Sequence, residues 1–492
     1  MSANSRQTWV LATILTCLAS ASFLHAQAFF APSAPPPEAL PADQIFPRGR
    51  IFPFIGFSGK AQWQKDNGYT VFGPVYGDEA SQMEALAEAK AAGLPFIFRV
   101  GLEMNFLGKG GGQPVAMKAE DVRLAISKQA AAAMTDPAVC WWYVTPEELR
   151  YWVPAEIEYL EAARKALATD PQKRPMWMYE PNSRDAAALA LTGRHQDIMG
   201  KGFYTNYAGF KDDRVWIRWS AEQEMDALKK LGRKNGLALV MPELAADPEP
   251  ADEPLIPVWA RHDVYAGLIH GCKGVAIWSL FKRPEVTKTH EAWMTAYASV
   301  AKELTGPKAL GQVFLFGEPR KSLALTQTAG PATVELLLGK ARGEEATDIS
   351  ASDRRKLTEK FPAFSSAELA YGTARYLFLT NDTASPLIIE IKGFPKGCEI
   401  ASVFDESTQE SSTGTLVLKL DKWGAAGLRF SAPGPTPAQR WKSTDGREIE
   451  ARFVRLEGED VLLVREGQSL KIPLVKLAEE SQELARRLGS SR

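Results

Sequence analysis

The stretch that decides the fold is Leu237-Ala238-Leu239-Val240-Met241-Pro242-Glu243, a short apolar run that ends at a carboxylate. About a hundred residues earlier the chain repeats this pattern, because residues 140–144 are apolar and Thr145-Pro146-Glu147 follows them. Continuous apolar runs of this length are typical of strands that are buried on both faces of a parallel sheet. Both glutamates therefore stand where a buried strand is expected to end.

Around these two runs, residues 48–307 alternate apolar segments with amphipathic helical segments. Eight βα units in about 250 residues predict a (β/α)8 barrel. A doubly wound open sheet is the alternative, but Phe57-Ser58-Gly59-Lys60 is not the Gly-rich turn that usually follows its first strand. The candidate strands are residues 51–57, 69–76, 95–100, 139–144, 175–179, 198–204, 237–241 and 274–278.

Capping residues place several of the helices. Residues 78–91 are predicted to form a helix that ends at Gly93, a typical C-cap glycine. Pro154 opens a second helix, since proline is favoured at the first helical position. Ser220 and Gln223 have capping-box spacing, which predicts a helix that begins near Ser220 and ends before Gly232.

The pattern of apolar and turn residues changes after residue 307. Short strands separated by turn residues predict an antiparallel β-sandwich over residues 310–432. Pro433-Gly434-Pro435-Thr436-Pro437 begins a linker at residues 433–438. Residues 439–490 are predicted to form a small β-barrel module with a hairpin at 449–464 and a final helix at 481–488. The predicted sandwich strands are residues 313–316, 334–338, 376–380, 387–391 and 415–420.

The first 47 residues have the composition of a targeting segment and a leader. Arg6, an apolar segment and Ala26-Gln27-Ala28 predict a signal peptide over residues 1–28, so we expect a secreted or periplasmic protein without a membrane span after cleavage. An uncleaved anchor is the alternative. Residues 29–47 are rich in Pro and Ala and are predicted to be disordered.

The composition limits the partners of the chain. A net charge of −1 argues against nucleic acid, because phosphate binding requires a basic face. Five scattered His and no phosphate-binding glycine loop predict neither a metal nor an organic cofactor. Cys140, Cys272 and Cys398 are an odd number after residue 28, so no complete disulfide framework is expected.

Barrel enzymes build their sites from the loops at the carboxyl ends of the strands. The mixture of carboxylate, amide and aromatic groups predicted there suits a neutral ligand rich in hydroxyl groups. Residues at or just beyond the predicted strand ends include Arg99, Glu147, Glu148, Tyr179, Glu180, Asn182, Tyr204, Asn206, Glu243 and Trp278.

This arrangement resembles the clan A glycoside hydrolases, which are (β/α)8 barrels with an acid/base Glu after strand four and a nucleophilic Glu after strand seven. The resemblance covers residues 48–307 and implies that Glu147 and Glu243 are catalytic and cleave a carbohydrate by a retaining mechanism. It also implies that Tyr204 steadies the nucleophile and that Trp278 forms the floor of a sugar subsite. Arg99, Tyr179, Glu180, Asn182 and Asn206 complete the expected substrate-binding set.

Pro146 is a departure from the clan, which usually has an Asn there that binds the sugar 2-hydroxyl. Two interpretations therefore stay open, a glycosidase and a non-catalytic carbohydrate- or protein-binding protein on a degenerate barrel. Glu148, next to Glu147, is a second candidate for the acid/base residue.

The last fifty residues resemble the Sla-type homology domain, a small Src-homology-like barrel. That domain binds proteins or peptides, so the resemblance implies a possible protein partner; a purely structural appendage is the alternative. The matching residues are Trp441, Asp445-Gly446-Arg447, Ile449-Glu450-Ala451, Phe453-Val454, Val461, Ile472-Pro473-Leu474 and Leu477.

Overall fold

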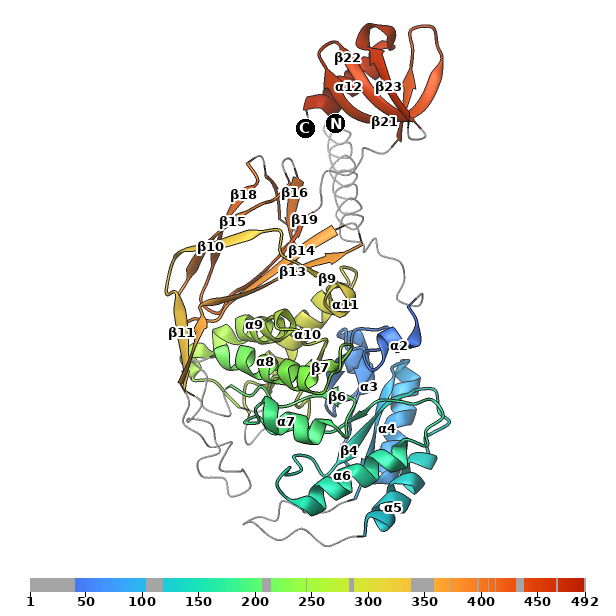
Figure 1. The fold of residues 1–492 in the computed structure, drawn as a ribbon, viewed down its shortest axis with the longest axis vertical. Coiled ribbons are helices and arrows are strands. Elements are labelled where there is room, and N and C mark those ends of the chain that lie inside the picture. The colour runs from blue at the N-terminus through green and yellow to red at the C-terminus, as the bar shows by residue number, and fades with distance from the viewer. Residues whose placement is uncertain are drawn as a thin grey trace, which may run out of the picture.

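Figure 1 shows a helix-covered barrel, a β-rich part beside it and a separate C-terminal module. The predicted signal peptide, most of the predicted leader, Asn206 and most of the predicted linker lie outside the residues that the structure describes. This computed structural model describes residues 40–102, 118–205, 214–244, 246–282, 287–337, 358–372, 374–395, 398–405, 407–411, 413–430, 438–465 and 468–490.

Eight parallel strands form the barrel, which confirms the predicted fold. Their order is β5-β4-β3-β2-β1-β8-β7-β6, and a parallel bridge between Glu180 and Lys201 joins the ends of β5 and β6. The strands are β1 Phe54–Gly56, β2 Val71–Phe72, β3 Phe96–Gly101, β4 Val139–Thr145, β5 Met176–Trp177, β6 Ile198–Met199, β7 Leu237–Val240 and β8 Gly274–Ile277.

Helices cover the outside of the barrel (Figure 1). The predicted C-cap of α4 is confirmed, because Gly93 has a φ of 69°, and Pro154 opens α6 as predicted. The N-cap of α4 is Asp78, which accepts a hydrogen bond from Ser81 N. The helices are α3 Ala61–Asp66, α4 Glu79–Ala92, α5 Ala119–Ala131, α6 Pro154–Leu167, α7 Ala186–Gly193, α8 Val215–Lys230, the 3-10 helix Pro250–Leu255, α9 Ile256–Ile269 and α10 His290–Thr305.

Side chains of β4 and β5 alternate between the barrel lumen and the helix layer, as strand geometry requires. Trp141, Tyr143 and Trp177 belong to the lumen cluster, whereas Trp142 and Met178 pack in the layer under the helices. The three tryptophans are all buried. The lumen is therefore a packed core, and a site can form only at its mouth.

Three details of the sequence interpretation were wrong. Ser220 is a buried residue inside α8 and not its cap, because the helix begins a turn and a half earlier, at Val215. Residues 313–316 belong to a helix, α11 Leu310–Phe316, since a short apolar run does not distinguish a buried helix from a strand. The leader does not extend to residue 47, because helix α2 spans Ala42–Ile45 and buries Ile45.

Antiparallel sheets follow α11, as predicted. Strands β17-β16-β19-β14-β13-β9 form one sheet, β10-β15-β18 a second and β11-β12 a third. Leu377 and Leu379 of the first sheet and Ile389 of the second share one core. The strands are β9 Glu318–Arg320, β10 Ala324–Ala329, β11 Thr333–Leu337, β12 Thr358–Pro362, β13 Phe364–Tyr371, β14 Ala374–Asn381, β15 Leu387–Lys392, β16 Cys398–Ser402, β17 Thr408–Ser411, β18 Thr415–Leu420 and β19 Ala425–Phe430.

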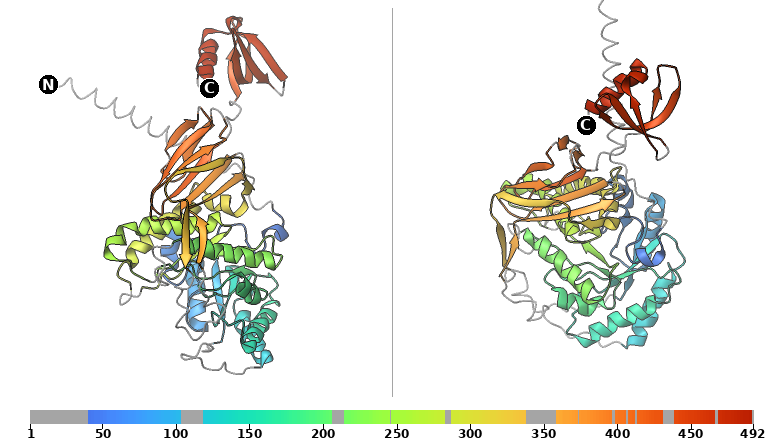
Figure 2. Two further views of the ribbon diagram at one scale, coloured as in Figure 1. Left: turned by 60° about the vertical axis from the view of Figure 1, so that its left-hand side comes forward. Right: turned by 45° about the horizontal axis from the view of Figure 1, so that its top comes forward.

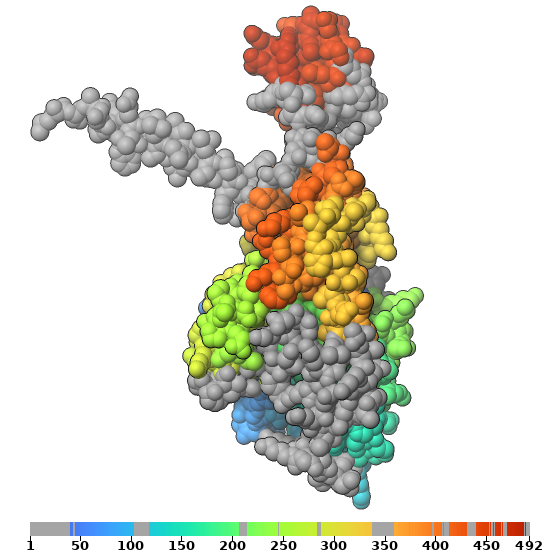
Figure 3. Space-filling view, turned by 90° about the vertical axis from the view of Figure 1, so that its left-hand side faces the viewer, coloured from blue at the N-terminus to red at the C-terminus, as the bar shows by residue number. Residues whose placement is uncertain are grey.

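The β-rich part is seated directly on the barrel helices (Figures 2 and 3). Tyr265 of α9, Phe314 of α11 and Phe378 of β14 form one aromatic cluster. The same junction buries His262 between two carboxylates, at 3.0 Å from Asp263 and 3.2 Å from Asp382 of the β-rich part. Apolar packing and buried polar contacts therefore join the two parts.

The described residues of the C-terminal module form a four-stranded antiparallel sheet, a short 3-10 helix and one α-helix. Trp441 stacks on Phe453 and donates a hydrogen bond to the Ala451 carbonyl at 2.8 Å. An isolated bridge from Ser443 to Leu477 joins the two ends of the module. The elements are β20 Ala438–Lys442, β21 Glu448–Glu457, β22 Asp460–Arg465, β23 Gln468–Pro473, the 3-10 helix Leu474–Lys476 and α12 Glu479–Ser490.

Within the described ranges, no helix has both the length and the apolar character needed to cross a membrane.

His262 predicts a pH-dependent contribution to stability. Burial would lower its pKa, but hydrogen bonds to Asp263 and Asp382 outweigh burial and raise the pKa above 6.5. A raised histidine pKa stabilises the fold fully below the unfolded-state pKa, and the stabilisation is lost as the pH rises through the folded-state pKa. We expect the Tm difference between the wild type and His262→Gln to be larger at pH 6 than at pH 9.

Thermal unfolding followed by circular dichroism at both pH values measures this difference. The control is His195→Gln, since burial lowers the pKa of His195. For this variant the Tm difference from the wild type should not become smaller as the pH rises from 6 to 9. An equal Tm difference at pH 6 and pH 9 for His262→Gln would contradict a charged His262 at the junction.

Candidate active site

Glu147 lies just beyond the end of β4, at the mouth of the barrel. Its Oε1 accepts hydrogen bonds from the Tyr143 hydroxyl at 2.5 Å and the Tyr76 hydroxyl at 2.9 Å. Burial raises the pKa of Glu147, although the two phenols and the charge of Arg99 oppose the rise. A raised pKa favours the protonated form of this carboxyl over that of an exposed glutamate, which is the direction that a proton donor requires.

Glu243 follows β7 and is buried, with 3% of its surface exposed. A parallel bridge pairs Glu243 with Trp278, beyond the end of β8, and its backbone carbonyl accepts a hydrogen bond from the Tyr297 hydroxyl at 3.1 Å. The backbone of Glu243 is therefore held from β8 and from α10. Parallel strands present their carboxyl ends at one face of a barrel, so Glu243 and Glu147 share the mouth.

Three aromatic rings form a stack across the mouth. Tyr204 lies between Tyr179, at 6.2 Å between ring centroids, and Trp278, at 5.5 Å. Gly202 permits this approach, because a Cβ there would lie 2.6 Å from the Tyr179 hydroxyl oxygen. The Trp278 indole also points its Nε1 at the Tyr76 hydroxyl, 3.3 Å away. Aromatic faces of this kind can pack against the C–H face of a sugar ring.

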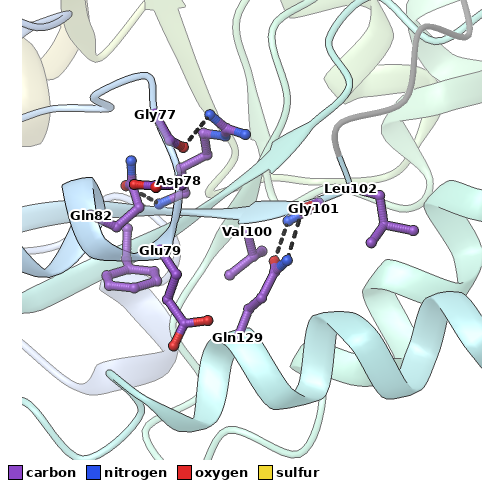
Figure 4. A pocket seen from close by; sticks show the side chains of 10 residues that line it. Gly77, Asp78, Glu79, Gln82, Val100, Gly101, Leu102 and Gln129 are labelled. Atoms are coloured by element: carbon purple, nitrogen blue, oxygen red, sulfur yellow. Dashed lines mark hydrogen bonds between the residues drawn. The ribbon is translucent and has the colours of Figure 1, made fainter.

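Arg99 of β3 supports the same edge of the mouth. Its Nε donates to Thr145 Oγ1 at 3.1 Å and its Nη1 to the Gly77 carbonyl at 2.8 Å. Figure 4 shows the small cavity beside it, of about 180 Å³, between β3, the start of α4, and α5. Gln129 fills one wall of this cavity and pairs its amide with both backbone polar groups of Gly101. The hydrogen bonds to Thr145 and Gly77 hold the Arg99 guanidinium in place, and its charge opposes the rise in the pKa of Glu147.

Two predicted substrate-binding residues do not join this group. Glu180 is fully buried, and its carboxylate is occupied by Arg184 and by Gln196 Nε2. The side chain points away from the lumen because Tyr179 points into it, and neighbours along a strand alternate. The prediction that Glu180 binds substrate is therefore corrected, because this carboxylate is a structural group of the helix layer.

Asn182 ties strand ends together. Its Oδ1 accepts from Tyr204 N at 3.3 Å and from Trp216 Nε1 at 2.8 Å, and its Nδ2 donates to the Tyr204 carbonyl at 3.3 Å. It positions Tyr204 in the stack. Glu148 lies in the loop after β4 with a φ of 59°, and its backbone N–H donates to the Tyr179 carbonyl at 3.0 Å.

Tyr76 and Tyr143, the two donors to Glu147, were not among the site residues predicted from the sequence. Tyr76 ended the predicted second strand, so its place at the mouth was available from the strand count. Tyr143 lies inside β4, and only its lumen-facing register, two residues after Trp141, could have indicated it.

Removing the partner of Glu180 should destabilise the barrel and identify this carboxylate as structural. Loss of one partner from a buried ion pair costs about 3–5 kcal/mol, because a charge stays buried without compensation. For Arg184→Met we expect a fall of this size in the free energy of unfolding, measured by urea denaturation. The control is Lys165→Met, which breaks an exposed i,i+4 pair with Glu161 and should change stability very little. Similar effects of both variants would exclude a structural role for the buried pair.

No protein-family model and no curated protein matches the sequence. Among solved structures, the α-amylase from Geobacillus thermoleovorans in complex with acarbose is 9% identical, covering 78% of this chain and 100% of that chain with a TM-score of 0.45. A catalytic mutant of a GH42 β-galactosidase from G. stearothermophilus is 9% identical, with coverages of 78% and 99% and a TM-score of 0.48. A GH30 endoxylanase from Clostridium papyrosolvens is 10% identical, with coverages of 78% and 97% and a TM-score of 0.41. Likenesses this distant transfer neither activity nor substrate to this chain.

Proposed function

We propose that this chain is a retaining glycoside hydrolase that cleaves a poly- or oligosaccharide. The observation that supports this most directly is the state of Glu147, a half-buried carboxyl at the barrel mouth whose pKa is raised by burial. A second carboxylate, Glu243, follows β7 at the same mouth. Two carboxyl groups with different environments are what acid-assisted displacement at an anomeric carbon requires.

In the proposed mechanism Glu147 donates its proton to the leaving glycosidic oxygen while Glu243 attacks the anomeric carbon. The glycosidic bond breaks and a glycosyl ester forms on Glu243. Glu147, now ionised, takes a proton from water, and the oxygen of that water replaces the ester. The sugar emerges with its original anomeric configuration, and both carboxyl groups return to their first states.

The surroundings of the two carboxyls support a carbohydrate as substrate. Trp278 bridges to Glu243 and stacks on Tyr204, which provides an apolar ring surface beside the proposed nucleophile. Phenol hydroxyls of Tyr76 and Tyr179 add neutral polar groups nearby. A neutral ligand with hydroxyl groups and apolar C–H faces fits this combination.

A non-catalytic carbohydrate-binding protein is the second candidate, and Pro146 favours it. Proline has no side-chain donor or acceptor, so it cannot replace the Asn that usually stands before the acid/base residue. The same aromatic stack would serve a binder equally well, which makes turnover the decisive property.

We also propose export and a docking role for the ends of the chain. The composition of residues 1–28 supports export through a signal peptide. The Sla-type resemblance of residues 439–490 supports a contact with another protein. Hydrogen/deuterium exchange on the C-terminal module in the presence of candidate partners would detect that contact.

Substituting the two carboxylates separates the proposed roles. Glu243→Gln should lower kcat by about 10³-fold or more, because the nucleophile is lost. Glu147→Gln should lower it by about 10²–10⁴-fold on substrates with poor leaving groups. The measurement is hydrolysis of a polysaccharide and nitrophenyl-glycoside panel, with NMR of the first product to establish retention.

Glu148→Gln is the matched control and should retain activity within a few-fold of the wild type. Full activity of Glu243→Gln, or loss of activity in Glu148→Gln alone, would overturn the assignment. If the wild type hydrolyses no member of the panel but binds glycans, the non-catalytic candidate is correct.

A further inference from the structure

Tyr76 connects the two sides of the candidate site. It follows β2, and 41% of its surface is exposed. Its hydroxyl lies 2.9 Å from Glu147 Oε1 and 3.3 Å from Trp278 Nε1. A phenol hydroxyl can donate one hydrogen bond and accept others, so Tyr76 can donate to Glu147 while it accepts from the indole. The residue therefore joins the proposed proton donor to the proposed sugar floor.

The backbone around Tyr76 is held on both sides. Gln82 of α4 donates through Nε2 to the Val75 carbonyl at 2.6 Å, and Arg99 donates through Nη1 to the Gly77 carbonyl at 2.8 Å. Gln82 is itself fixed, because its Oε1 accepts from Arg99 N at 3.1 Å. Figure 4 shows Gln82 and Gly77 on the walls of the cavity beside β3. A half-exposed aromatic residue is thus given a rigid position.

The hydrogen bonds to Glu147 distinguish its two oxygens. Both phenols, Tyr76 and Tyr143, donate to Oε1. Within the described part of the chain, Oε2 has no hydrogen bond to protein. A proton on this carboxyl is then expected on Oε2, because Oε1 already accepts two donors. Rotation of the carboxyl would break both hydrogen bonds, so the phenols also fix its orientation.

We propose that Tyr76 is a positioning residue that aims the Oε2 proton of Glu147 at the bond to be cleaved and couples that aim to Trp278. The inference rests on the proposed function for its catalytic meaning. The hydrogen bonds themselves do not depend on that function. Tyr76 thereby supplies orientation at a site where the residue before the acid is Pro146.

The groups that face Glu147 determine whether its pKa rises or falls when the Tyr76 hydroxyl is removed. They are Arg99 of β3, Tyr143 of β4, and the tyrosines that follow β2, β5 and β6, which are Tyr76, Tyr179 and Tyr204. Glu148 and Glu243 share the mouth. A hydrogen bond donated to a carboxylate favours its ionised form. Removal of the Tyr76 hydroxyl should therefore raise the pKa of Glu147 further.

The test compares the wild type with Tyr76→Phe by two measurements on the full chain. The first is an NMR titration of [δ-13C]glutamate, with the Glu147 signal assigned by its loss in Glu147→Gln. The second is the pH profile of kcat/KM on the best substrate of the panel. For Tyr76→Phe we expect a higher titration midpoint of Glu147, an alkaline limb moved to higher pH and a fall of about ten-fold in kcat at the optimum.

Tyr69→Phe is the matched control. Tyr69 precedes β2 on the same segment and is buried, and its hydroxyl has no hydrogen-bond partner among the described residues. Tyr69→Phe should leave the Glu147 midpoint and the alkaline limb unchanged. An effect of Tyr69→Phe equal to that of Tyr76→Phe would overturn the proposal, because the change would then come from the strand and not from the hydrogen bond.

The two measurements separate this proposal from the proposed function. If Tyr76→Phe leaves the midpoint of Glu147 unchanged, Tyr76 does not position it, whether or not the wild type hydrolyses glycosides. If the midpoint rises while the wild type hydrolyses nothing, the hydrogen bond from Tyr76 to Glu147 is supported. The glycosidase proposal then fails, and with it the proposal that Tyr76 orients a catalytic proton. If the midpoint and the limb rise together, both are supported.

Discussion

The candidate site depends on the packing of aromatic rings in the barrel lumen. Tyr143 lies between Phe57, at 5.8 Å, and Trp177, at 5.0 Å, and both ring pairs are edge-to-face. Such pairs have a preferred geometry in addition to their burial. A ring held from two sides cannot swing, so its hydroxyl has one place to point, which is Glu147 Oε1. The packing of Tyr143 against Phe57 and Trp177 below the mouth therefore fixes the orientation of the Glu147 carboxyl at the mouth.

Raised pKa values alone do not locate the site. Burial raises the pKa of Glu147, Glu180 and Glu224, the last to about 8. Glu180 and Glu224 are fully buried in the helix layer, where Arg184 and Lys201 N–H hold them. Glu147 has neutral phenols as partners and lies at the mouth. A raised pKa together with access to solvent distinguishes Glu147, which can exchange a proton with a substrate, from Glu180 and Glu224, which stabilise the fold.

The sequence was sufficient for the barrel because most of its strands are continuous apolar runs, and burial on both faces of a sheet leaves that pattern in the chain. It was also sufficient for the positions of Glu147, Glu243, Tyr204 and Trp278, since strand ends follow from strand positions. It was insufficient for Glu180, because two adjacent residues at a strand end point in opposite directions and the pattern does not say which one faces the lumen. The contact between Tyr76 and Glu147 joins residues 71 positions apart, and no local rule predicts such a pair.

The departure at Pro146 has a consequence for how this mouth can recognise a sugar. Asn182 is the nearest amide by strand order, but its carbonyl accepts two hydrogen bonds and its amino group donates one, all to the protein. The Asn182 carbonyl oxygen is therefore occupied by two donors, and it cannot accept from a sugar hydroxyl without losing the bond to Tyr204 N or to Trp216 Nε1. The mouth supplies phenol hydroxyls instead, and burial raises the pKa of Tyr179 and Tyr204 well above 10. These hydroxyls stay neutral over the range in which Glu147 titrates, so a change of pH in that range alters the proton on the acid and leaves the surrounding hydrogen-bond donors intact.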